Sequence, residues 1–154
     1  LASLAVGKAL SFRVTRAVTA QDMAQVRAIR QQVFIDEQHI PAELEWDGHD
    51  DACVHVLAFV TAGTAVGTGR LAPDGRIGRM AVLASWRGRG AGRALLTALL
   101  EAAREAGRER VYLHAQESAR HFYDRAGFRA LGDPYLEAGI RHVSMEMRLD
   151  ADDT

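Results

Sequence analysis

The chain lacks most of the features that mark secreted, membrane-bound or nucleic-acid-binding proteins. Its 154 residues include one cysteine, Cys53, so no intramolecular disulfide can form, which suits a reducing compartment. No apolar stretch approaches the ~20 residues of a membrane span. The formal net charge of −1 gives no overall attraction to nucleic acids or to anionic membranes. We therefore expect a cytoplasmic protein that has neither nucleic acid nor a membrane as a partner.

The chain also lacks any feature that would divide it. It contains no internal repeat, low-complexity segment or linker. Its composition, 48% hydrophobic and 25% charged residues, is that of an ordinary globular domain. We expect a single domain over residues 11–150. A flexible lead-in over residues 1–10, without a convincing cleavage pattern, is expected to precede it.

Hydrophobic periodicity predicts strands first and alternating elements later. A strand near residues 12–16 precedes a helix that Thr19 or Asp22 can cap and that continues to Phe34. An acidic and aromatic loop then runs to Asp51. Further strands are predicted at residues 53–61, 65–71, 76–83, 110–115, 128–132 and 143–149, with helices at residues 90–106 and 118–125. This order predicts a mixed sheet of class α+β.

The most informative segment is a turn rich in glycine and arginine, residues 87–92, between a predicted strand and a predicted helix. The first N–H groups of a helix are free and lie at the positive end of its dipole. Glycines allow close approach and arginines add positive charge, so the turn suits a phosphate. It lacks the lysine and hydroxyl residue of a Walker A loop. Arg93 stands where a dinucleotide fingerprint needs its last glycine.

The pattern that remains is Arg-x-x-Gly-x-Gly, formed by Arg87, Gly90 and Gly92. It resembles the acetyl-CoA pyrophosphate loop of the GNAT superfamily of N-acetyltransferases. Residues 119–128, which end in Gly127-Phe128, are similar to the last helix and following turn of that superfamily. Residues 33–41, 44–48, 78–82, 113–116 and 137–142 resemble the smaller ElaA-like bacterial branch within it.

The resemblance implies both a fold and a cosubstrate. The GNAT fold is a mixed, mostly antiparallel sheet of about seven strands with about four helices, splayed between its fourth and fifth strands. Acetyl-CoA enters that gap, which here would lie between residues 80–82 and 113–115. By resemblance, the cofactor-binding residues are Met80, Ala81, Val82, Arg87, Gly88, Arg89, Gly90, Ala91, Gly92, Arg93 and Phe122. No metal is expected, because the spacing of His49 with Asp47, Asp50 and Asp51 matches no standard metal loop.

Acetyl transfer to a primary amine by direct attack requires a neutral amine, a donor for the developing oxyanion and an acid for the leaving thiolate. The resemblance places Tyr123 beside the sulfur of CoA, and we predict that it is the general acid. His114 is a candidate for relaying the proton of the amine through water. Glu37, Glu45 and Asp47 are further candidates for the base, although many superfamily members use a water chain without a single base.

These three carboxylates have two other interpretations, which the sequence leaves open. They either bind a cationic acceptor by charge complementarity or form a solvated acidic loop. His142 belongs to an expected loop at residues 137–142. Three positions are open for its side chain: packed against the protein, at the surface, or facing the acceptor pocket. The acceptor itself, a small-molecule or peptide amine, is not specified by the sequence. Dimerisation is common on this fold, so a homodimer is one expected assembly.

Two alternative functions are weaker. A non-catalytic acyl-CoA sensor or interaction module on the same fold is disfavoured because Tyr123 and the glycine turn are intact. Nucleic-acid binding is disfavoured by the near-neutral charge and by the absence of a reading motif. It would use the arginines at positions 76, 79, 87, 89 and 93.

Overall fold

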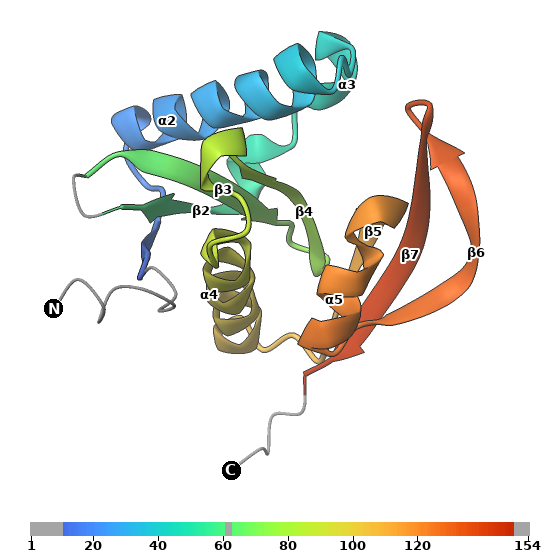
Figure 1. Cartoon of the computed structure of the whole chain (residues 1–154). Helices are drawn as coiled ribbons and strands as arrows, with labels where there is room; N and C mark the ends of the chain where they lie inside the picture. The colour runs from blue at the N-terminus through green and yellow to red at the C-terminus, as the bar shows by residue number, and fades with distance from the viewer. Residues whose placement is uncertain (1–10, 61–62, 150–154) are drawn as a thin grey trace, which may run out of the picture.

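A seven-stranded sheet organises the computed structural model, which describes residues 11–60 and 63–149 (Figure 1). The predicted lead-in over residues 1–10 lies outside the described residues. The strand order is β1-β2-β3-β4-β5-β7-β6. Only β4 and β5 pair in parallel, which confirms the predicted mixed, mostly antiparallel sheet. The strands are β1 (Arg13–Arg16), β2 (Val54–Phe59), β3 (Ala65–Leu71), β4 (Arg76–Val82), β5 (Arg110–Gln116), β6 (Arg129–Glu137) and β7 (Ile140–Arg148).

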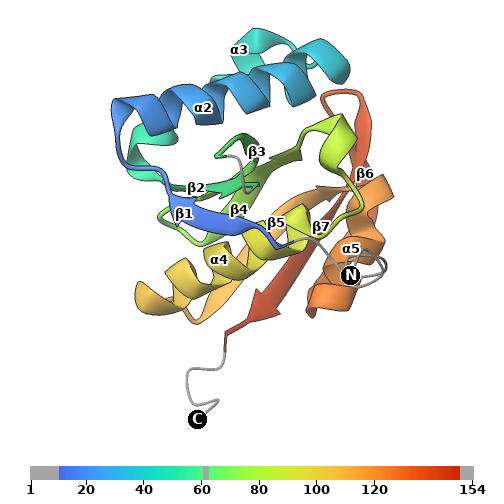
Figure 2. The same cartoon turned by 60° about the vertical axis from the view of Figure 1, so that its left-hand side comes forward.

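Helices cover both faces of this sheet. Figure 2 shows α2 and α4 on opposite faces, with the strands between them. Over the described ranges there are four α-helices, as expected, together with one π-helical segment and three short 3-10 turns. The helical segments are α2 (Ala20–Arg30), the π-helix (Gln31–Glu37), α3 (Ala42–Glu45), α4 (Ala91–Glu105), α5 (Arg120–Ala126) and the turns Asp50–Ala52, Ala84–Trp86 and Glu117–Ala119.

Helix α2 begins at a capping box in which both predicted capping residues take part. Thr19 is the N-cap and accepts a hydrogen bond from the backbone N–H of Asp22, whose carboxylate accepts one from the backbone N–H of Thr19. The helix buries Val26 and Ile29 against β2 and β4. The helix predicted up to Phe34 is shorter than the helical segment, which continues to Glu37. Its type also differs, because the chain widens into the π-helix from Gln31 onward.

Helix α4 packs on the other face, against β1 to β4. Leu95, Leu96 and Leu99 are nearly inaccessible to solvent, and burying each stabilises the fold by roughly 1.5–3 kcal/mol. Two glycines of β3 allow this close approach. A Cβ atom at Gly67 would lie 2.9 Å from Leu95 Cδ1, and one at Gly69 would lie 2.8 Å from Leu99 Cδ1.

The last two strands are longer than predicted and form a hairpin. Ala138 (φ 53°) and Gly139 (φ 77°) make its two-residue turn. The segment 137–142 is therefore the end of a hairpin and not an open loop. The predicted strand ends at residue 132, just before the turn-like residues Asp133 and Pro134. Here they lie within a shift of register between Leu131 and Tyr135, on an edge strand that tolerates proline.

Candidate active site

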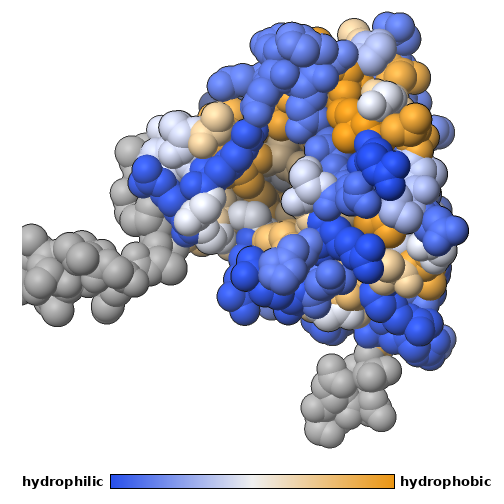
Figure 3. All heavy atoms as spheres, turned by 45° about the vertical axis from the view of Figure 1, so that its right-hand side comes forward, coloured by the Kyte–Doolittle hydropathy of each residue, from blue (hydrophilic) through white to orange (hydrophobic). Residues whose placement is uncertain are grey.

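A cavity of about 490 Å³ opens where β4 and β5 separate. Within the described chain these strands pair only through Arg76 with Tyr112 and Ile77 with Leu113, so they diverge beyond Ile77. The predicted splay is confirmed. Figure 3 shows this side of the molecule hollowed, with hydrophobic residues in the recess and hydrophilic residues along its rims. The walls come from β4, β5, the segment 34–47 and the tip of the β6–β7 hairpin.

A bulge in β4 marks the start of the divergence. Thr68 of β3 pairs with Ala81, whereas Arg70 pairs with Gly78, so β4 holds one extra residue. Arg79 lies in this bulge with φ at 51°, a conformation that costs a non-glycine residue roughly 1–3 kcal/mol. Its guanidinium offsets part of that cost by donating to the carbonyl oxygens of Leu44 (3.1 Å) and Glu45 (3.0 Å).

The glycine turn follows β4 at the same end of the sheet. Gly90, with φ at 101°, is the N-cap of α4, and Gly88 has φ at 74°. A Cβ atom at either position would meet no other atom of the described residues within 4 Å. Among the residues described, no acceptor pairs with the backbone N–H groups of residues 88–93. These free donors lie at the positive end of α4, where a helix can bind an anion; that the turn binds one stays a prediction.

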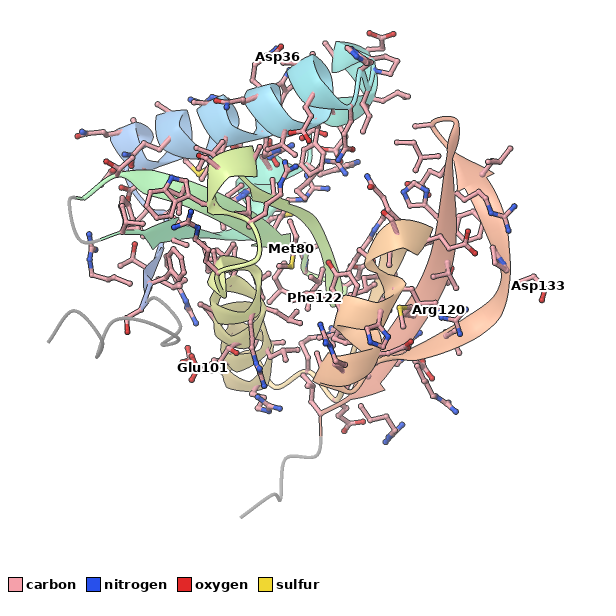
Figure 4. The ribbon with its side chains drawn as sticks, in the orientation of Figure 1. Asp36, Met80, Glu101, Arg120, Phe122 and Asp133 are labelled. Carbon is pink, nitrogen blue, oxygen red and sulfur yellow. The ribbon has the colours of Figure 1, made fainter. Side chains whose placement is uncertain are left out.

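Tyr123 of α5 lies in the cavity wall. Its side chain is 8% exposed and packs edge-on against the rings of Phe122 and Phe128. Burial raises the pKa of Tyr123 to about 12, so its hydroxyl keeps its proton at neutral pH. In Figure 4, Met80 and Phe122 lie between the α4 half and the α5 half of the molecule. Met80 lines the cavity, whereas Phe122 packs over Gly92, whose Cβ position is 3.5 Å from the ring.

Comparison with known proteins agrees with this geometry. A family model described as an acetyltransferase (GNAT) domain matches residues 14–149. The chain belongs to the GNAT acetyltransferase family.

Relatives of this GNAT chain match it over nearly their whole length. The Bacillus subtilis protein YjcF, named as an uncharacterized N-acetyltransferase, is 34% identical over 84% of this chain and 97% of its own. An acyl-CoA N-acyltransferase from Pseudomonas aeruginosa is 30% identical, with a TM-score of 0.78 over 89% of this chain and 99% of that one. ElaA from Escherichia coli has the same TM-score and coverage at 25% identity. The likeness to ElaA confirms the resemblance seen in the sequence.

Arg87, one of the residues predicted to bind the pyrophosphate, has other partners here. The two terminal nitrogens of Arg87 each donate to a carboxylate oxygen of Glu37 at 2.7 Å, and its Nε donates to the carbonyl oxygen of Val82 at 2.8 Å. The bonds from Arg87 lower the pKa of Glu37. Arg89 and Arg93 are exposed and make no ion pair among the described residues. Arg87 therefore ties the turn to the end of the π-helix, while Arg89 and Arg93 are available to an anion.

His114 lies in the cavity beside a hydrogen-bonded tyrosine that sequence reasoning missed. Its Nδ1 is hydrogen-bonded to the hydroxyl of Tyr135, which accepts a further bond from Ser144 at 3.2 Å. Burial, and then the charge of Arg76, lower the pKa of His114. The imidazole is therefore neutral at neutral pH and able to accept a proton. Tyr135 also stacks on His142, which lines the same cavity.

Glu45 and Asp47 line the cavity as predicted, but neither belongs to a solvated acidic loop. Both are part of an arginine–carboxylate cluster composed of Arg30, Arg70, Arg79, Glu45, Asp47 and Asp50.

Arg30, with no exposed surface, donates to Glu45 Oε2 at 2.7 Å and to Asp50 Oδ1 at 2.8 Å. Arg70 pairs with Asp47 at 2.9 Å. Burial opposes the ionisation of Asp47, yet hydrogen bonds from Arg70 and from the backbone of His49 hold its pKa well below its usual value. Three cations therefore balance three carboxylates within the protein.

The third predicted acceptor-side carboxylate, Glu37, is placed away from these two. It pairs with Arg87 and is not among the residues that line the cavity. Sequence reasoning could have found the cluster through one signal, because Arg30 occupies an apolar-stripe position of its helix, after Val26 and Ile29. An arginine there must be paired when it is buried.

Two absences apply to the described residues alone. Residues 11–60 and 63–149 contain no group of three or more histidine, cysteine, aspartate or glutamate side chains that could hold a metal ion. No helix in the same ranges is long and apolar enough to cross a membrane.

Proposed function

We propose that this chain transfers an acetyl group from acetyl-CoA to a primary amine by direct attack in a ternary complex. The observation that carries the proposal is the position of two features at one end of the sheet. The cavity opens where β4 leaves β5, and the free N–H groups at the start of α4 follow that same strand. One elongated cosubstrate could therefore place its thioester in the cavity and its pyrophosphate at the turn.

The described residues fit such a ligand. The N–H groups of residues 88–93, with Arg89 and Arg93, would bind the pyrophosphate. The open space around Gly90 leaves room for its oxygens. The backbone edge of Met80–Val82 has no partner in β5, so the amides of the pantetheine arm would pair with it.

In the reaction, the nitrogen of a neutral amine attacks the thioester carbonyl carbon and the C–S bond breaks, giving an amide and the CoA thiolate. The amine proton leaves through His114 or through water, and the Tyr123 hydroxyl protonates the thiolate. Burial raises the pKa of Tyr123 to about 12, so the hydroxyl would hold its proton until the thiolate forms beside it.

The experiment combines calorimetric titration of acetyl-CoA with a screen of amines that follows release of the CoA thiol. Gly90→Asp places a carboxylate at the proposed phosphate site and should weaken acetyl-CoA binding by more than about tenfold. Gly107→Asp is the matched control, since Gly107 also has positive φ (77°) and open space but lies beyond the other end of α4. Thermal unfolding checks that both variants fold.

Tyr123→Phe separates catalysis from binding. We expect it to lower turnover by about a hundredfold, in line with the loss of a general acid, while acetyl-CoA affinity changes little. Unchanged turnover would remove Tyr123 from the mechanism. Acetyl-CoA binding without thiol release for any amine would support a non-catalytic acyl-CoA module, and binding that survives Gly90→Asp would overturn the assignment of the turn.

A further inference from the structure

The charges around the acceptor side of the cavity are mostly compensated inside the protein. Glu45, Asp47 and Arg79 line the cavity, but all three belong to the arginine–carboxylate cluster, whose charges balance. They therefore present no net charge to a substrate. The charged groups that remain in the wall are Arg76 and Glu137.

Arg76 is a cation without a partner in the described part of the chain. It is the first residue of β4, opposite Tyr112 of β5, and it lines the cavity. Within residues 11–60 and 63–149 its guanidinium makes no hydrogen bond or ion pair. The neighbouring carboxylate of Asp74 accepts bonds from the Tyr112 hydroxyl and from the backbone N–H of Arg76. Its charge interacts with that of Arg76, but no ion pair joins the two side chains.

Glu137 is the complementary charged group that lines the same cavity. It lies at the hairpin turn, its side chain is 46% exposed, and one of its oxygens is 3.9 Å from His114 Nδ1. Because burial keeps His114 neutral, that contact leaves the carboxylate charge uncompensated. Arg76 lines the same cavity as His114 and its charge acts on the imidazole, so the candidate base is influenced by both a cation and an anion.

We infer that the acceptor is a primary amine that carries a carboxylate, with Arg76 binding the carboxylate and Glu137 receiving the ammonium group beside His114. This inference rests on the proposed function. A guanidinium binds a carboxylate through two parallel hydrogen bonds. One free cation matches the single charge of a carboxylate, whereas a phosphate would bring close to two negative charges. The acceptor class is thus that of free amino acids.

The test compares amines that differ in a carboxylate, in the wild type and in Arg76→Gln. The pairs are L-leucine with isoamylamine and L-phenylalanine with phenethylamine, and the measured quantity is the ratio of kcat/KM within each pair. We expect the wild type to favour the carboxylate by about 10- to 100-fold, the range for a charge-assisted hydrogen bond. In Arg76→Gln the ratio should fall to the value set by the chemical reactivity of the two amines alone. That reactivity difference is the same for both enzymes, so the change in the ratio reports on Arg76.

Two further variants make the result specific. Arg148→Gln, which changes an exposed strand arginine outside the cavity, should leave the ratio unchanged. Glu137→Gln should raise KM for both members of a pair alike, because both carry the amine.

Thiol release with amines but with an equal ratio in the wild type and in Arg76→Gln would overturn the inference while leaving the acetyltransferase proposal intact. A preference of the wild type for phosphoethanolamine over β-alanine would also overturn it. An absence of thiol release with every amine would instead contradict the proposed function.

Discussion

Glu45→Gln tests whether the arginine–carboxylate cluster supports the cavity wall. The substitution keeps the shape of the side chain but removes the charge that faces two arginines. Glu45 Oε2 accepts from Arg30 Nε at 2.7 Å and lies 3.3 Å from Arg79 Nε. The Glu45 side chain is 3% exposed and that of Arg30 is not exposed at all, so water cannot replace the lost partner.

The expected loss is large for one polar substitution. Removing one member of a buried ion pair costs about 3–5 kcal/mol. Arg30 would keep Asp50 at 2.8 Å and the Glu45 carbonyl oxygen at 3.1 Å, and glutamine retains one acceptor oxygen. These contacts place the loss in free energy of unfolding near the lower end, at about 3 kcal/mol. For a chain of this length, that corresponds to a fall in Tm of roughly 6–12 °C.

Equilibrium urea unfolding, followed by tryptophan fluorescence, measures this loss directly. Trp46 reports on the site, because the Arg30 guanidinium lies 4.9 Å from its ring centroid. Glu43→Gln is the control, since Glu43 lies on the same short helix but is exposed, and it should change stability by less than about 0.5 kcal/mol. If Glu45→Gln proved as mild as Glu43→Gln, the cluster would not hold the wall and the reasoning would fail.

Two other predictions concern function. We expect Arg87 to hold the turn through Glu37 without contacting phosphate. Glu37→Gln and Arg87→Gln should then weaken acetyl-CoA binding by similar factors of less than about tenfold, and their losses in binding free energy should not add in the double variant. A much larger loss for Arg87→Gln alone would show direct contact with phosphate. Because the pKa of His114 is lowered and the base must be neutral, activity should fall on acidification only below about pH 6.5. His114→Gln should remove that acidic limb, and a limb that persists would exclude His114 as the base.

Local patterns were sufficient to predict the elements that position the site. The leucine spacing of α4 and the capping pair Thr19 and Asp22 each act within a few residues, so the sequence shows them directly. The glycine turn belongs to the same class, because positive φ at Gly88 and Gly90 follows from local chain geometry. The limits of the last hairpin were missed because tertiary pairing overrides the turn-like residues Asp133 and Pro134.

The polar contacts of the site depend on pairings between distant parts of the chain. Arg70 meets Asp47 across 23 residues, and Arg87 meets Glu37 across 50. No periodicity carries such information, so Glu45 and Asp47 looked like free acidic groups of a loop. Charge counting alone could not show that arginines neutralise them. The position of Arg76 became informative only once its neighbours were seen to be paired.

The bulge at Arg79 makes the splay and the acceptor wall parts of one structure. Its backbone takes up the extra residue where β4 leaves β5. Its guanidinium holds the carbonyl oxygens of Leu44 and Glu45 and reaches the Asp47 carboxylate at 3.2 Å. A strained backbone persists only when its surroundings over-determine it, and here the restraint is the acceptor wall itself. The gap that would admit acetyl-CoA and the wall that would contact the amine therefore stabilise each other, so a substitution that loosens one should alter the other.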